Sequence, residues 1–177
     1  MPEEWFDVVD EHDRPIGRAT RAEVHRLGLR HRSVHMLVFN ARGELFLQRR
    51  SEHKDNFPGL WDSSAAGHVE AGETYEETVP RELHEELGLV LRTPPQFLFA
   101  FPASPLTGME FVRVYRIEAE GPFVLDPVEV AEGRWFTPQA VDAWLSEHPQ
   151  QTTATLHEIW GRWCAMAAAG RNVHSEP

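Results

Sequence analysis

The sequence has few of the residues that cross-link, export or anchor a protein. Its single cysteine, Cys164, excludes an internal disulfide and a zinc site built from cysteines. No apolar run approaches the roughly 18 residues that span a bilayer, and the first residues are acidic where a leader peptide would be basic. We therefore expect a cytoplasmic protein without a membrane partner, in which oxygen or imidazole ligands would hold any metal.

Basic residues are also scarce. The 177 residues include 17 Lys and Arg against 28 Asp and Glu, and the resulting net charge of −11 argues against binding to nucleic acid. The charges are unevenly placed, because ten of the 17 basic residues precede residue 55, whereas 67–89 holds seven acids and one arginine. A basic patch that faces an acidic cluster would suit an anionic substrate bridged by a metal. Chance clustering on a solvated surface is the alternative.

The length predicts one domain over residues 1–177, with strands in the first two thirds and helices at the end. Apolar runs predict strands at Trp5–Val9, Val34–Phe39, Leu45–Gln48 and Phe111–Ile117, with a breaker-rich turn over 10–17. Helices are predicted at 74–88, after Thr137-Pro138, and over 152–169 with an interruption at Gly161. The polar tail 171–177 is predicted to fray.

The predicted helix inside the strand-rich region carries the chemistry. Residues Thr74–Glu77 have the form of a capping box, and Gly88 is placed to end the helix. Glu82, Glu85 and Glu86 recur at i, i+3 and i+4, so they share one helix face and repel one another. A hard divalent cation such as Mg²⁺ would offset this repulsion, because it binds a few carboxylates together with substrate phosphates. A solvated acidic helix is the alternative.

The spacing of this segment is more specific than its charge. The pattern reads Gly67-x5-Glu73-x7-Arg81-Glu82-Leu83-x-Glu85-Glu86-x-Gly88-Leu89 and resembles the Nudix box in every defining position. The resemblance implies an α/β fold, an α/β/α sandwich with a mixed β-sheet. It also implies that a loop–helix–loop over 67–89 holds Mg²⁺ or Mn²⁺ for attack of water on a diphosphate.

The resemblance also implies roles for individual residues. By position, Glu82, Glu85 and Glu86 resemble the family's metal ligands. The alternative role for Glu82 is that of the base in the reaction. Arg81 and Glu73 are similar to residues that orient those ligands.

One residue departs from the box. Pro80 stands where the family usually has a small helix former, and a proline in mid-helix costs about 3 kcal/mol. We therefore expect a kink in the first turn, which leaves the start of the helix open but not the glutamates that follow.

A nearer branch of the superfamily, the isopentenyl-diphosphate isomerases, shares further motifs with this chain. They are His31-Arg32, Phe39-Asn40, Arg49-Arg50, Lys54, the Phe-Pro-Gly-Leu-Trp run at 57–61 and Gly67-His68. The resemblance implies a second metal site at His31, His68 and Glu110, with His25 matched less closely. The essential cysteine of that branch is missing, because Ala65-Ala66 stand there, and isomerisation needs both an acid and a base. The chain therefore resembles the isomerase-like hydrolases.

Two charged segments lie outside the box. Arg49, Arg50 and Lys54 precede the run at 57–61, where basic residues of the isomerase branch hold the diphosphate, so Arg50 and Lys54 are predicted phosphate ligands. A solvated loop is the alternative. Glu129 and Glu132 resemble an acidic loop that donates one more carboxylate to the metal or to the attacking water, and surface charges are again the alternative.

We therefore expect a divalent-metal-dependent hydrolase of a small-molecule diphosphate, namely a nucleoside diphosphate linked to another group or a related compound. An isomerase-like enzyme and a non-catalytic ligand-binding module are the alternatives. We expect no nucleic-acid partner, and a homodimer is compatible with the sequence.

Overall fold

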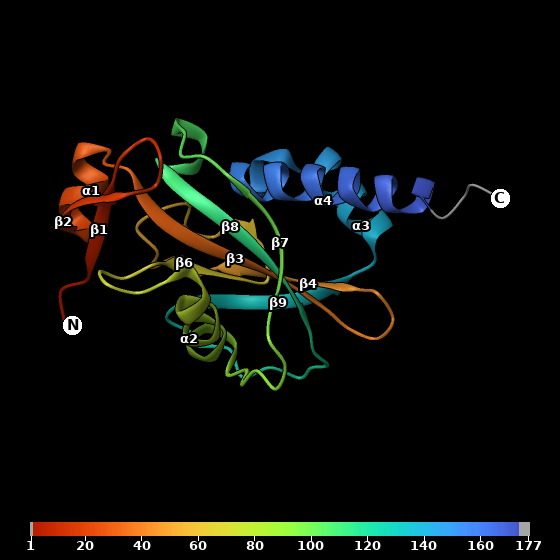
Figure 1. Ribbon diagram of the computed structural model, residues 1–177. Helices are drawn as coiled ribbons and strands as arrows, with labels where there is room; N and C mark the ends of the chain where they lie inside the picture. The colour runs from red at the N-terminus through yellow and green to blue at the C-terminus, as the bar shows by residue number, and fades with distance from the viewer. Residues whose placement is uncertain (1, 174–177) are drawn as a thin grey trace.

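The computed structural model describes residues 2–173, and its centre is a mixed β-sheet between two helical layers (Figure 1). The strands run in the order β5-β4-β3-β8-β7, with β6 paired to β3 and β9 to β4. Their bounds are β3 (His31–Phe39), β4 (Leu45–Arg50), β5 (Trp61–Asp62), β6 (Ala65–His68), β7 (Gln96–Phe101), β8 (Glu110–Glu118) and β9 (Val130–Phe136). Strands β3 and β8 are parallel, whereas the other pairs in this sheet are antiparallel. The predicted α/β architecture with a mixed sheet is confirmed.

The central strand β3 explains why helices cover both faces. Its even-numbered apolar residues, such as Val34 and Met36, belong to the core beneath α2 (Tyr75–Leu87). Its odd-numbered residues Leu37 and Phe39 belong to the core beneath α3 (Pro138–Glu147) and α4 (Ala154–Val173). Successive side chains of a strand point to opposite faces, so an apolar strand of this kind needs a layer on each side.

The N-terminal residues form an additional layer at one end of the sheet (Figure 1). Strands β1 (Trp5–Val9) and β2 (Pro15–Thr20) pair as a hairpin, and α1 (Arg21–Leu27) follows with Thr20 as its N-cap. The predicted turn over 10–17 is therefore too long, because β2 begins at Pro15. Helix α1 is a second helix in the strand-rich region that the sequence did not predict. Its seven residues bury Val24 alone among apolar side chains, which is too few for a periodic pattern.

Helix α2 begins and ends where the sequence predicts. Thr74 and Glu77 form the reciprocal hydrogen bonds of a capping box, and Gly88 ends the helix with φ +63°. The helix continues through Pro80, whose side chain is exposed.

Helix α4 corrects one prediction. It runs without a break from Ala154 to Val173, so the predicted interruption at Gly161 is wrong. Gly161 lies on the exposed side, where it costs about 1 kcal/mol relative to alanine, whereas Ile159 and Trp160 pack into the core and hold the helix together.

Two short 3₁₀ turns, η1 (Pro105–Thr107) and η2 (Pro149–Gln151), complete the fold. Of the tail predicted at 171–177, the first three residues belong to α4, and 174–177 lie outside the described residues. No helix within 2–173 is long and apolar enough to cross a membrane.

Candidate functional site

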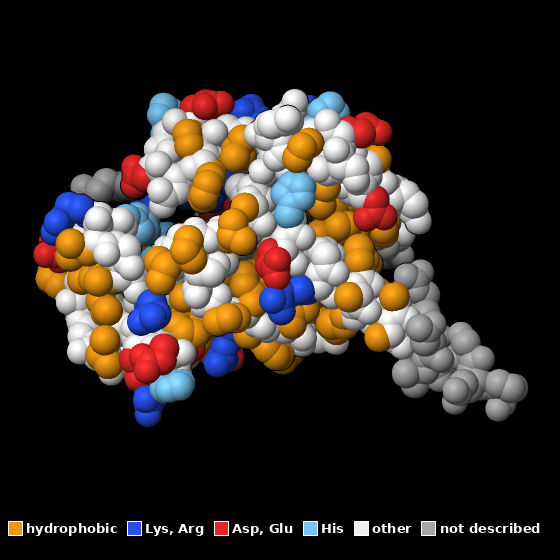
Figure 2. Space-filling view, turned by 90° about the horizontal axis from the view of Figure 1, so that it is seen from above, with side chains coloured by type: hydrophobic (Ala, Val, Ile, Leu, Met, Phe, Trp, Pro, Cys, Tyr) orange, Lys and Arg blue, Asp and Glu red, His pale blue; other side chains and the backbone are white. Residues whose placement is uncertain are grey.

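A cavity of about 260 Å³ lies where the N-terminal layer, the sheet and helix α2 meet. Figure 2 shows charged and histidine side chains around a hollow at that end of the molecule. Most of the predicted site residues line it: His25, Arg50, Lys54, His68, Arg81, Glu82, Glu85, Glu86, Glu110 and Glu129. Residues that are up to 104 positions apart in the chain therefore share one site.

Glu82 and Glu86 are the buried carboxylates of the box. Glu86 Oε2 accepts hydrogen bonds from the backbone N–H of Ala66 (3.1 Å) and from Nε2 of Gln48 (2.8 Å). Glu82 packs so closely on β6 that a Cβ at Gly67 would lie 1.9 Å from its carboxyl carbon. Glycine at position 67 is therefore a condition for the position of Glu82.

Burial changes the acidity of both groups. Burial raises the pKa of Glu86 to about 7. It also raises the pKa of Glu82 well above its usual range, and the nearby charge of Glu86 adds to this shift. Glu85 is the exposed member of the three and lines the same cavity. The three side chains thus present oxygen ligands to one cavity, and burial disfavours the negative charge of Glu82 and Glu86.

Arg81 and Glu73 hold the box together from behind. Arg81 donates to both carboxylate oxygens of Glu73, at 2.8 Å each, and to the backbone oxygen of His68 at 3.0 Å. It also donates to Glu82 at 2.8 Å and lies 3.4 Å from Glu85. These bonds outweigh the effect of burial and lower the pKa of Glu73. A single guanidinium therefore orients two of the three carboxylates on the cavity wall.

The box fits a divalent cation on its own chemistry. Carboxylates with raised pKa values gain the most when a cation neutralises them, because their charged form is poorly solvated. Gln48 adds a carboxamide oxygen, Oε1, that is buried and has no hydrogen-bond partner among the described residues. An all-oxygen set of this kind suits Mg²⁺ or Mn²⁺.

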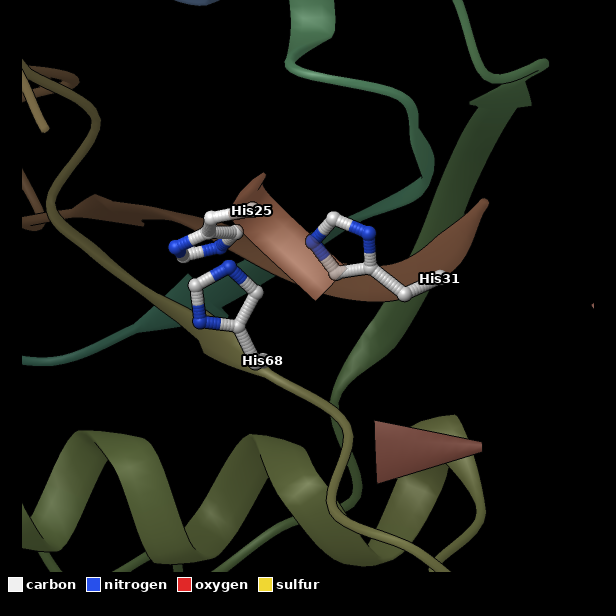
Figure 3. Close-up of side chains that lie close together, drawn as sticks. All are labelled: His25, His31 and His68. Atoms are coloured by element: carbon white, nitrogen blue, oxygen red, sulfur yellow. The ribbon is translucent and has the colours of Figure 1, made fainter. Parts of the chain in front are cut away.

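Three histidines form a second cluster at the N-terminal end of the cavity. Figure 3 shows the rings of His25 from α1, His31 from β3 and His68 from β6 turned toward one another. One ligand atom from each lies within 4.8 Å of the other two. Glu110, at the start of β8, reaches the same cluster, because its Oε1 lies 2.9 Å from Nε2 of His68 and 3.6 Å from Nε2 of His31.

The hydrogen bonds and the burial of these rings suit metal binding. Nδ1 of His31 lies 2.9 Å from the carbonyl oxygen of Leu29, which can only accept, so Nδ1 carries a proton. Nε2 of His31 is buried without a hydrogen-bond partner among the described residues. Burial, together with the neighbouring His68 and His31, lowers the pKa of His25 to about 4, which keeps this ring neutral. A neutral imidazole held by a backbone carbonyl is the usual form of a metal ligand.

The predicted phosphate-binding residues divide into two groups. Arg50 and Lys54 line the cavity, whereas Arg49 lies outside the lining and faces Glu52 and Glu132. Arg50 is held by two hydrogen bonds to the backbone oxygen of Asn56, at 3.1 and 2.8 Å. Both predicted ligands therefore lie on the cavity wall, where Arg50 pairs with Asp62 (3.5 Å) and Lys54 pairs with Glu129.

The two acidic residues predicted beyond the box, Glu129 and Glu132, occupy different positions. Glu129 lines the cavity and forms an ion pair with Lys54. Glu132 lies in β9 outside the lining, where Arg134 (3.1 Å) and Arg49 (3.5 Å) pair with it. Glu129 therefore stays a candidate for the reaction, and Glu132 occupies the position of a surface charge.

Two residues of the site were missed in the sequence. Arg21 lines the cavity from α1, pairs with Glu4 at 2.8 Å, and has a buried Nε without a hydrogen-bond partner among the described residues. Gln48 contacts Glu86 from the neighbouring strand. For Gln48 a signal existed, since a polar residue ends the apolar run Leu45–Leu47. For Arg21 there was none, because only the packing of α1 brings it to the cavity.

The place of the missing isomerase cysteine is also clear. Ala66 lines the cavity and donates its backbone N–H to Glu86. Cys164 belongs to α4, where it packs against the core beneath α3 and α4, and it is not part of the cavity lining. No thiol of the described residues therefore lines the cavity.

Comparison with known proteins identifies the family. Residues 29–159 match the model of the NUDIX domain. A Nudix hydrolase of Pseudomonas aeruginosa, PA4841, is 41% identical over 134 residues, which cover 74% of this chain and 77% of that protein. An isopentenyl-diphosphate Delta-isomerase of Burkholderia multivorans is 32% identical over 174 residues, covering 97% of this chain and 96% of that protein.

A solved structure is similar to this chain in both fold and sequence. The crystal structure of DR0079 from Deinococcus radiodurans superposes with a TM-score of 0.79 and 32% identity. The match covers 90% of this chain and 98% of that one.

Proposed function

The chain belongs to the Nudix family and is a Nudix hydrolase, and from that premise we propose that it hydrolyses a diphosphate linkage with Mg²⁺ or Mn²⁺. The substrate is a nucleoside diphosphate linked to another group, or a related small diphosphate. One observation supports this most directly: the three box carboxylates Glu82, Glu85 and Glu86 line the same cavity as Arg50 and Lys54. Ligands for a cation and ligands for a phosphate thus line one cavity.

Each residue contributes a distinct part of the reaction. Glu82, Glu85 and Glu86 would hold the cation. Arg81, itself held by Glu73, orients Glu82 and Glu85, and Gln48 with the backbone N–H of Ala66 orients Glu86. The cation, when bound, neutralises phosphate charge and lowers the pKa of a bound water. The phosphate oxygens bind to the basic side chains that line the cavity around the acidic wall, namely Arg21, Arg50 and Lys54.

Two residues remain candidates for the base that takes a proton from the attacking water. Glu82 has a raised pKa, which makes it a stronger base near neutral pH. Glu129 reaches the cavity and is tied to Lys54. Glu132 lies outside the cavity lining and is not retained. The pH profiles of kcat for Glu82→Gln and Glu129→Gln distinguish the two candidates. Only the variant that lacks the base should lose the acidic limb of its profile while it still binds the metal.

We also propose that the histidine cluster binds a second metal, through His31, His68 and Glu110 together with His25. Imidazole nitrogens with one carboxylate suit zinc or another transition metal better than Mg²⁺. The buried Nε2 of His31 supports this proposal, because a buried polar atom without a hydrogen-bond partner is normally avoided.

The isomerase relative calls for a direct test. Ala66 stands where the isomerase branch has its cysteine, and an alanine side chain neither donates nor accepts a proton. We therefore expect no interconversion of isopentenyl and dimethylallyl diphosphates by this chain. Interconversion at an enzymatic rate would favour the isomerase interpretation instead.

The deciding experiment is a hydrolysis screen with a matched pair of variants. Nucleotide sugars, dinucleoside polyphosphates, nucleoside diphosphates and triphosphates, and coenzyme A are incubated with Mg²⁺ or Mn²⁺, and released phosphate is measured after phosphatase treatment. Glu86→Gln should remove most of the activity, because charge is needed to hold the cation. Glu76→Gln is the control on the same helix, since Glu76 contacts Arg113 and Tyr115 outside the cavity lining.

Equal turnover of the two variants, or turnover in excess chelator, would overturn the metal-dependent mechanism. Binding of a diphosphate without turnover of any substrate would favour the non-catalytic module.

The remaining features of the proposal concern the whole protein. We propose that residues 1–177 form one domain that acts in the cytoplasm on a small molecule, without nucleic acid. A homodimer stays a prediction, which sedimentation equilibrium tests.

A further inference from the structure

The cavity extends beyond the box carboxylates to a wall that the proposed hydrolysis does not use. On the face of β3 toward α4, the residues after His31 are Ser33 and His35, followed by apolar Leu37 and Phe39. Ser33 and His35 line the cavity, and Thr155 from the first turn of α4 lines it as well. The strand thus changes from core to polar wall at the point where the cavity begins.

All three residues have hydrogen-bonding capacity that the described part of the chain does not use. Oγ of Ser33 is buried without a partner. His35 contacts Ser63 through Nδ1 at 2.7 Å, so its Nε2 is unused. The hydroxyl of Thr155, a residue that is 9% exposed, has no partner among residues 2–173. Because buried polar groups are normally paired, the buried Oγ of Ser33 indicates a polar ligand, and the two other unused groups line the same cavity.

Charge at this wall argues for a neutral ligand group. Asp62 also lines it, and its Oδ1 accepts hydrogen bonds from Thr153 Oγ1 (3.0 Å) and the backbone N–H of Ser63 (2.8 Å). Its Oδ2 lies 3.5 Å from Nη1 of Arg50, so the two charges offset each other at this wall. Hydroxyl groups, which both donate and accept, match serine, threonine and imidazole without requiring a net charge.

We propose that Ser33, His35 and Thr155 form a subsite for a hydroxyl-bearing ring of the substrate, a sugar or a ribose next to the diphosphate. This assignment rests on the proposed hydrolase function. Residues 33 and 35 are about 7 Å apart along the strand, a span that one ring with several hydroxyls bridges and a single hydroxyl does not. A prenyl or alkyl chain would leave all three polar groups unpaired, which a polar site discriminates against strongly.

The test compares substrates that differ only in their hydroxyl groups. ADP-ribose is compared with the ADP butyl ester, which lacks the terminal ring, and with ADP-ribose whose nucleoside carries a 2′,3′-dideoxyribose. We expect one of the two replacements to lower kcat/KM by roughly tenfold or more, and the affected arm shows which ring occupies the subsite.

The variants Ser33→Ala and Thr155→Val connect that loss to the wall. Each should lower kcat/KM for ADP-ribose. The kcat/KM for the analogue that lacks the hydroxyls bound at the subsite should stay nearly unchanged, so the ratio of the two values becomes smaller. Thr152→Val is the control, since Thr152 is buried at the same end of α4 but contacts Pro149 and His157 outside the cavity lining. Thermal melts establish that each variant is folded, and either wall variant alone suffices for the test.

The outcomes separate this subsite from the hydrolase function. If ADP-ribose and its analogues are hydrolysed equally well, or if the wall variants slow all three alike, these residues hold water only and the subsite is wrong while the hydrolase stands. If the protein hydrolyses no diphosphate with Mg²⁺ or Mn²⁺, the hydrolase function itself fails.

Discussion

Gly67 shows how one residue controls the approach of two elements. A Cβ at this position would meet the carboxyl carbon of Glu82 at 1.9 Å and its two oxygens at 2.0 and 2.4 Å. Real Cβ atoms do not approach so closely, so a larger residue must displace the carboxylate. The same carboxylate is held by Arg81, and its displacement therefore disturbs the acidic wall as a whole.

We predict that Gly67→Ala lowers kcat by tenfold to 100-fold, because a misplacement of about 1 Å at a reacting site costs that order. The apparent affinity for Mg²⁺ should fall in the same assay. Gly17→Ala is the matched control, since a Cβ there has no neighbour within 4 Å. Unchanged kinetics in Gly67→Ala would show that Glu82 relaxes freely and that its position is not critical.

A variant of His68 can distinguish the two proposed metal sites. It belongs to the histidine cluster through its ring, whereas its backbone oxygen accepts from Arg81 of the box. We predict that His68→Ala loses a transition metal that copurifies with the wild type, as measured by elemental analysis. Because the backbone contact persists, Mg²⁺ binding at the box should be retained, as measured by calorimetry. Wild-type protein without any such metal, even after growth with added zinc or manganese, would contradict the second site.

At the scale of elements, helix α2 contains a residue that opposes its own structure. Pro80 is the sixth residue of the helix, so it removes a backbone hydrogen bond that a regular helix would form. Its side chain is exposed, and a replacement therefore loses no core packing. The apolar stripe Val79, Leu83 and Leu87, which is fully buried, holds the helix on the sheet in spite of the proline.

We predict that Pro80→Ala stabilises the protein by about 1 to 3 kcal/mol, the difference between proline and alanine inside a helix. For a chain of this size that corresponds to a rise in Tm of about 2 to 4 °C per kcal/mol. Differential scanning calorimetry measures the shift, with turnover recorded in parallel. No rise in Tm would indicate that the helix has already adapted to the missing hydrogen bond.

At the scale of the whole molecule, the buried carboxylates couple stability to pH and to metal. The pKa of Glu86 is raised by burial from 4.5 to about 7. A folded state with a raised pKa binds the proton more tightly than the unfolded chain. The stabilisation from this proton is therefore complete below pH 4.5 and is lost as the pH rises through 7. A bound cation reverses the effect above pH 7, because it binds the ionised form.

We predict that metal-free wild-type protein loses stability relative to Glu86→Gln between pH 4.5 and 7. Saturating Mg²⁺ should then stabilise the wild type more than the variant at pH 8. Thermal unfolding in chelator and in Mg²⁺ across this range measures both effects. Parallel curves for the two proteins in chelator would contradict the raised pKa.

The local parts of the site were predictable from the sequence because their determinants lie close together in the chain. The capping box at Thr74, the left-handed glycine at Gly88 and the shared face of the three glutamates depend on neighbours within four residues. The apolar run Val34–Phe39 likewise predicts a strand. For such features the backbone geometry of one element decides the arrangement, whatever the rest of the chain does.

Other features depended on tertiary structure, since they require contacts between distant segments. His25, His31, His68 and Glu110 converge only because α1 packs beside the sheet and β3 pairs with both β6 and β8. The choice between Glu129 and Glu132 depends on how β9 pairs with β4, where a register shift follows the pairing of Arg49 with Glu132. An irregularity of this kind changes which side chain faces the cavity, and no local pattern in the sequence encodes it.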